Sequence, residues 1–372
     1  MIIFGSPRRY VQGPGALRAV GTEAARLGRS IGLVADAQVM DLVGSTVAAA
    51  AQEAGLHFRA LPFTGEVTLP EIERLVAACR GAEPPDVIVA AGGGKGIDTG
   101  KAVSSRLGAR LITLPTVASN DSSTSHIMVL YDADHRLTGV ERLPANPDAV
   151  IADTAVIARA PRVLLLAGIG DTVAKRFEAE ACSAAGGVNM FGGTPPRMAL
   201  AIAEASWEIL RADASAALDV AGGGTPTPAL ERVVEACLLM SGLAFESGGL
   251  SIAHAMTRGL TAVEPIAGVL HGLQVAYGVL VQVALDRSRG DELADLLSFY
   301  AEVGLPRSLG DLGMPDPGGN VLSAIAGPTI AAPHTRNFGR VLAEADLVTA
   351  MSHLEDIAAV QEGRRAMEIA AT

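Results

Sequence analysis

The chain has 372 residues, 49% of them hydrophobic and 19% charged, so it can bury a sizeable core and divide into two domains. A net charge of -11 with scattered Lys and Arg residues argues against nucleic acid as a partner, because phosphate-binding surfaces are normally basic. No secretory leader opens the sequence, and no uncharged apolar run reaches the roughly 18 residues of a membrane helix. We therefore expect a soluble, cytoplasmic protein that uses no membrane.

Short β-rich runs alternate with helical segments in the first part of the chain. The runs typical of strands lie at 30–36, 57–63, 86–91 and 109–116. This alternation is typical of a parallel sheet covered by helices. Farther along the chain only helical patterns follow, at 171–187, 196–212, 228–259 and 271–286. We predict an α/β domain of the dinucleotide-binding kind over residues 1–158 and an all-α domain over residues 159–372.

The segment VIVAAGGGKGIDTGKAV, residues 87 to 103, leads from an apolar run directly into three glycines. We expect a central strand, a tight turn at Gly92 to Gly94 and a helix that begins near Ile97. The free N–H groups at the start of such a helix attract a phosphate. The glycine spacing matches neither GxGxxG nor a Walker A loop, so the segment is a phosphate cradle of another kind or only a turn.

Two sets of polar residues suggest ligands. Asp36 ends an earlier strand and is the type of acid that hydrogen-bonds an adenosine ribose and repels a 2'-phosphate. Asp171, His254 and His271 supply one carboxylate and two imidazoles, which suits a catalytic zinc site with an open fourth position. They lie far apart in the sequence, so spacing alone does not separate ligands from isolated core or surface residues.

Several motifs occur together and in order along most of the chain, from about residue 5 to about residue 345. They include GGGKGIDTGKAV, LPTVASNDSSTSHIMVLYD, GIGDTVAKRFEAEACS, FESGGLSIAHAMTRGLTAV and HGLQVAYG. The combination resembles the glycerol dehydrogenase family, a zinc-dependent branch of the iron-containing alcohol dehydrogenase superfamily. The resemblance implies a dehydroquinate synthase-like architecture, with an active site in the cleft between an NAD-binding domain and a helical domain. It also implies a homo-oligomer.

The resemblance implies roles for individual residues. Asp36 would hold the ribose of NAD, and Asp121 would contact a hydroxyl of the substrate. The remaining cofactor residues would be Gly93, Gly94, Lys95, Asp98, Thr116, Ser119, Ser125, Ile127 and Tyr131. Zn²⁺, or Fe²⁺ or another divalent metal in its place, would be bound by Asp171, His254 and His271. The metal would act as a Lewis acid on an alcohol oxygen while the nicotinamide accepts hydride.

Some positions depart from the family pattern. Iron enzymes of the superfamily commonly have a His four residues after the ligand aspartate, and Lys175 stands there in this chain, which favours a three-residue zinc site. Arg176 replaces a common Trp. We interpret Lys175 and Arg176 as a solvated helix face, with reception of an anionic substrate as the alternative. His126 is unusual, and the segment 266–274 is more apolar than in the family, so these changes bear on the substrate.

The function that follows is an NAD- and zinc-dependent dehydrogenase. It would oxidise glycerol or a related small vicinal diol or polyol to the hydroxyketone and catalyse the reverse reduction. One alternative is a glycerol-1-phosphate or sugar-phosphate dehydrogenase. Another is a cyclase resembling dehydroquinate synthase, which uses NAD transiently; an aspartate rather than a glutamate as first metal ligand counts against it.

Overall fold

The computed structural model describes residues 1–81, 83–133 and 136–370, with side chains to residue 360. The chain folds into two compact units. The α/β unit consists of Gly5–Leu165 and Ala216–Leu243; the helical unit consists of Met1–Phe4, Leu166–Ser215 and Ala244–Thr372. The predicted domain boundary at residue 158 stays a prediction. Neither unit is one continuous segment, because Met1–Phe4 belongs to the helical unit and Ala216–Leu243 belongs to the α/β unit.

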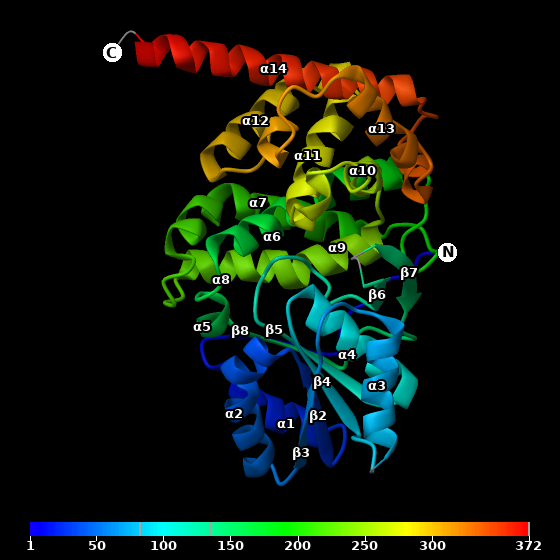
Figure 1. The fold of residues 1–372 in the computed structure, drawn as a ribbon, viewed down its shortest axis with the longest axis vertical. Helices are drawn as coiled ribbons and strands as arrows, with labels where there is room; N and C mark the ends of the chain where they lie inside the picture. Colours follow the sequence, from blue (N-terminus) through cyan, green and yellow to red (C-terminus); the bar gives the residue numbers. More distant parts are fainter. Residues whose placement is uncertain (82, 134–135, 371–372) are drawn as a thin grey trace. The chain divides into compact units, whose positions relative to one another are not determined.

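A parallel sheet forms the centre of the α/β unit, as expected from the apolar runs. Its order is β1 (Tyr10–Gly13), β8 (Ala149–Asp153), β5 (Arg110–Pro115), β4 (Val87–Gly92), β2 (Ser30–Ala35) and β3 (His57–Pro62). Every residue of β4 is buried because helices cover both of its faces. α1 (Ala19–Ala25) and α2 (Ala37–Glu53) share a core with Val87, Val89 and Ala91. α3 (Leu69–Arg80) and α4 (Gly94–Leu107) pack on the opposite face (Figure 1).

The α/β unit also contains elements that the sequence patterns did not indicate. An antiparallel hairpin joins β6 (Ile127–Tyr131) to β7 (Leu137–Arg142), and the short helix α5 (Thr154–Ile157) follows β8. β7 is mostly exposed, so it lacks the apolar run that reveals a buried strand. α4 begins at Gly94, three residues before the predicted start at Ile97.

Helices joined by loops and turns form the C-terminal part of the chain as far as the structure describes it, which confirms the prediction of a helical C-terminal part. They are α6 (Arg162–Ala184), α7 (Arg197–Val220), α8 (Pro228–Glu235), a π-helical turn (Ala236–Met240), α9 (Ser241–Gly248), α10 (Ile252–Leu260), α11 (His271–Ala284), α12 (Gly290–Val303), α13 (Gly319–Ile330) and α14 (Glu344–Ala370). Short 3-10 turns join several of them. In the helical unit α10 packs against both α11 and α13, and α14 packs against α11 and α13 (Figure 1).

The prediction of one helix over 228–259 is wrong. The π-helical turn interrupts it, and a sharp break of 99° separates Gly248 from Ile252. Gly249 explains the break, because its φ of +87° belongs to the left-handed region that glycine adopts without strain. In the described part of the chain no single helix is long and apolar enough to cross a membrane; by length and composition alone, the bent pair Pro228–Gly248 and Ile252–Leu260 passes that test.

Candidate active site

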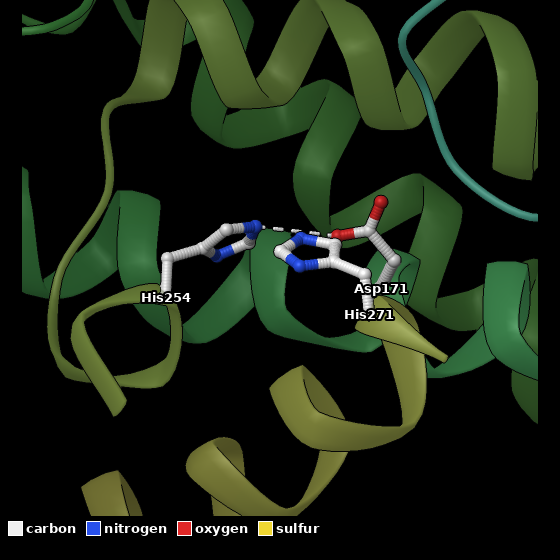
Figure 2. Close-up of side chains that lie close together, drawn as sticks. All are labelled: Asp171, His254 and His271. Carbon is white, nitrogen blue, oxygen red and sulfur yellow. Dashed lines mark ion pairs between the residues drawn. The ribbon is translucent and has the colours of Figure 1, made fainter. Parts of the chain in front are cut away.

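Three helices of the helical unit bring the predicted metal ligands together. Asp171 lies on α6, His254 on α10 and His271 begins α11. One ligand atom from each lies within 4.8 Å of the other two, and His254 Nε2 is 3.3 Å from Asp171 Oδ1. Figure 2 shows the two imidazoles and the carboxylate close together. Asp171 is buried whereas His271 is exposed, so an N, N, O donor set that suits zinc is within reach of solvent on one side.

The start of α10 is fixed by two buried side chains, which hold His254 in place. Glu178 Oε1 accepts the backbone N–H groups of Ser251 and His254 at 2.8 and 2.9 Å. Gln282 Oε1 accepts those of Ile252 and Ala253, both at 3.0 Å. These four N–H groups have no partner within the helix, so the two side chains replace a capping residue.

Glu178 also sets the chemistry of the His254 ring. Its Oε2 lies 2.5 Å from His254 Nδ1, which leaves Nε2 facing Asp171. A carboxylate on the far nitrogen is the usual support of a metal-binding histidine, because it fixes the ring and raises its basicity. Burial lowers the pKa of His254, but Glu178 and Asp171 raise it more, to about 9. A metal ion at Nε2 would therefore compete with a proton, so its uptake would release protons and would weaken as pH falls.

The interpretation of Lys175 as part of a solvated helix face is wrong. Its side chain is 1% exposed, and Nζ lies 2.6 Å from Asp171 Oδ1 on the same face of α6. Burial raises the pKa of Asp171, but Lys175 and His254 lower it more, so the net shift is well below the ordinary value. Arg176 is partly exposed and pairs with Glu204 and Glu292 instead.

Three of the candidate cofactor residues lie at one edge of the sheet in the α/β unit. β2, β4 and β5 are parallel neighbours, so Asp36, Gly93 and Thr116 follow the carboxyl ends of adjacent strands. Ligands of open α/β sheets bind at such an edge. Asp36 caps α2 by accepting the N–H of Val39 at 2.8 Å.

Glycines let the backbone approach closely at this edge. Gly92 has a φ of +134°, and a Cβ on Gly94 would lie 3.0 Å from Asn120 Nδ2. Both Gly93 and Gly94 are half-buried, and they open α4 with backbone N–H groups available to an anion. Lys95 is exposed and forms an ion pair with Glu66, and Ser119 is half-buried beyond β5.

Asp98 points into the unit rather than outward. Its Oδ1 lies 3.3 Å from the fully buried Lys101 Nζ, and its Oδ2 accepts the N–H of Val129 at 3.0 Å. Lys101 Nζ also donates to Ser125 Oγ at 3.2 Å and to the Ile127 carbonyl at 2.5 Å. The pair thus anchors the segment of Ser125 and Ile127 to α4. Half-buried Tyr131 ends the same strand, β6.

Asp121, the predicted substrate contact, is held by the residue that directly follows the π-helical turn. Buried Ser241, directly after that turn, donates to Asp121 Oδ2 at 2.8 Å. Thr124 Oγ1 donates to the Leu238 carbonyl inside the turn at 2.6 Å. A Cβ on Gly242 would lie 2.8 Å from Thr124 Cβ, so glycine allows this close approach. π-helical turns are frequent at functional sites, and this one positions a candidate catalytic carboxylate. His126 is buried in the same segment.

We predict that Ser241→Ala lowers kcat/KM for the alcohol about tenfold, because Asp121 loses a positioning hydrogen bond. The KM for the dinucleotide should stay unchanged. Steady-state kinetics with each substrate varied in turn checks this, with exposed Ser45→Ala on α2 as the control. An equal change in both KM values would show that Ser241 serves only the fold.

Known proteins resemble the chain over most of its length. The model of the family described as iron-containing alcohol dehydrogenase matches residues 7–154. A glycolaldehyde reductase of Halobacterium salinarum is 39% identical over 315 residues, 85% of this chain and 86% of that protein. A glycerol dehydrogenase of Citrobacter freundii is 38% identical over 338 residues, 90% of this chain and 91% of that protein. The chain belongs to the iron-containing alcohol dehydrogenase family. A crystal structure of glycerol dehydrogenase from Schizosaccharomyces pombe has a TM-score of 0.93 at 32% identity, covering 98% of this chain and 93% of that one.

Membership of the iron-containing alcohol dehydrogenase family makes the protein an oxidoreductase that acts on CH–OH groups, and the resemblance read from the motifs is confirmed. Three supporting residues of this alcohol dehydrogenase escaped the sequence reasoning: Glu178, Lys101 and Ser241. Glu178 could have been found from the sequence, because positions 171, 175 and 178 share one face of a helix. Lys101 has Asp98 three residues before it, but its contacts with Ser125 and Ile127 join distant segments, as does the hydrogen bond from Ser241 to Asp121, and no sequence pattern indicates them.

Proposed function

We propose that the protein is an NAD- and zinc-dependent dehydrogenase of glycerol or a related small vicinal diol, which also reduces the hydroxyketone. The observation that carries the proposal is the cluster of Asp171, His254 and His271, one carboxylate and two imidazoles with converging ligand atoms. The relatives named glycerol dehydrogenase and glycolaldehyde reductase support a small hydroxylated substrate. A homo-oligomeric state and a cytoplasmic location stay predictions.

The donor set fits zinc, which accepts two imidazoles and a carboxylate and keeps a fourth position open for substrate. A zinc ion held by these three residues would supply Lewis acidity at the alcohol oxygen. In this proposal Glu178 keeps the Nδ1 proton of His254, so that Nε2 serves as the ligand. Asp121, held by Ser241, orients a neighbouring hydroxyl of the diol.

The cofactor proposal rests on the strand-end residues. NAD would lie along Gly93, Gly94 and the start of α4, where backbone N–H groups can receive the pyrophosphate. The segment containing Ser125 and Ile127, fixed by Lys101, would support the cofactor farther along. Asp36 would select NAD, since its carboxylate accepts hydrogen bonds from a ribose and repels a 2'-phosphate.

Asp36→Ser is expected to raise kcat/KM with NADP relative to NAD about tenfold or more, because the repelling charge is removed. Serine is chosen because it can still accept the Val39 N–H and cap α2. Absorbance at 340 nm with each dinucleotide gives the ratio, and Asp41→Ser at an exposed site of α2 is the matched control. An unchanged ratio would remove Asp36 from the ribose site.

The function as a whole is tested on metal-stripped enzyme with and without added Zn²⁺. NADH formation at 340 nm is followed with NAD and a panel of diols, polyols, hydroxyketones and polyol phosphates. Zinc-dependent turnover that favours an unphosphorylated diol is the expected result. Turnover of phosphorylated compounds alone, or conversion without net NADH, would transfer the function to the phosphate-specific or cyclase alternatives.

A further inference from the structure

The chain has three lysines, and one of them lies inside the candidate metal cluster. Lys175 Nζ is 2.6 Å from Asp171 Oδ1 and 3.5 Å from His254 Nε2. Those two atoms also face each other at 3.3 Å, so they are the atoms that a shared metal ion would contact. The ammonium group also lies 5.4 Å from the ring centroid of Phe245. The side chain of Lys175 is 1% exposed.

We propose that Lys175 is an internal cation that competes with the metal ion for Asp171 and His254. The inference rests on the proposed metal site. A dication bound by both atoms has to share Asp171 with the ammonium or displace it. Either event costs energy in a buried site, where like charges are poorly screened. Lys175 therefore weakens metal binding.

The same contact stabilises the protein when no metal is bound. Asp171 is buried, and a buried carboxylate without a partner is strongly destabilising. Lys175 supplies that partner from the next turn of α6, while Glu178, one further turn along, engages His254. The ligand residues are thus held in place by charges of the chain itself. The metal-free enzyme should stay folded and take up its metal reversibly.

A neighbouring residue offers a matched comparison. Arg176 is also a cation of α6, but it pairs with Glu204 and Glu292 and lies over the ring of Phe177 at 5.0 Å. Removing its charge takes away a cation one position along the same helix without touching the contacts of Asp171. Any effect specific to Lys175 is therefore separable from a general change in the charge of α6.

The test measures zinc affinity by competition with a chromophoric chelator, on full-length wild type, Lys175→Met, Lys175→Gln and Arg176→Met. Glutamine removes the charge and keeps an N–H donor on a shorter side chain. Both Lys175 variants are expected to bind zinc about 10- to 100-fold more tightly than wild type, and Arg176→Met within about twofold of it. Melting temperatures of chelated samples should fall for the Lys175 variants, and added zinc should raise them more than in wild type.

The outcomes are distinguishable. Zinc binding of equal strength in wild type and both Lys175 variants would overturn the competition while leaving the metal site in place. Weaker binding in both variants would overturn it as well, and would make Lys175 a support of the site. An absence of zinc binding in every protein, wild type included, would remove the metal site and the inference with it. If the variants misfold when chelated, refolding in excess zinc before the competition still yields the affinity.

Discussion

Replacing His271 with alanine is expected to lower kcat/KM for the alcohol at least about a thousandfold and to remove bound zinc. A three-residue site that loses one ligand binds its metal weakly and loses the polarising charge at the alcohol oxygen. His271 is exposed at the first position of α11, so its removal should leave the fold intact. The measurement combines metal content after gel filtration with absorbance at 340 nm.

The control is His353→Ala, an exposed histidine on α14 in the same helical unit. It should keep both zinc and activity. If His271→Ala retained a full complement of zinc with wild-type turnover, the histidine would not be a ligand. If it lost zinc yet kept its activity, the metal would have no part in the reaction.

The second large effect is expected from Gly272→Ala, one residue beyond that ligand. A Cβ there would lie 1.8 Å from the carbonyl oxygen of Ala167 and 2.6 Å from its carbonyl carbon, so α11 would have to move away from α6. We expect a loss of about 3 kcal/mol in the free energy of unfolding. Because α6 and α11 carry Asp171 and His271, zinc affinity should fall too.

Urea denaturation with and without zinc measures both effects of Gly272→Ala. Gly290→Ala is the matched control, since it lies at the start of α12 with nothing within 4 Å of its added Cβ. That change should be neutral or slightly stabilising, because alanine favours a helix. Equal stability of the two variants would mean that α6 and α11 separate at little cost.

The buried parts of the fold were predictable because their sequence patterns are strong. β2, β4 and β5 carry apolar runs, which are typical of strands in a sheet that is covered on both faces. The hairpin of β6 and β7 was not predictable, because the mostly exposed strand β7 lacks such an apolar run. In addition, Lys101, which anchors β6 through the Ile127 carbonyl, lies on α4. The break at Gly249 was missed because the flanking helical patterns are continuous in sequence.

The candidate ligands were recognisable from motifs, but their surroundings depend on tertiary contacts. Lys175 reads as a surface residue in a helix because long charged side chains are rarely buried. Its burial results from the packing of α10 and α11 beside α6, which brings His254 and His271 to Asp171. The hydrogen bond from Ser241 to Asp121 likewise depends on a π-helical turn that no local sequence pattern indicates.

The way the backbone passes between the compact units limits how this enzyme can be cut or recombined. It crosses after Phe4, Leu165, Ser215 and Leu243, and the last three crossings fall inside α6, α7 and α9. A fragment ending at residue 158 would lack Ser241, and with it the hydrogen bond that holds Asp121. A chimaera that exchanges a whole unit with a relative needs four junctions, and three of them must preserve helical phase.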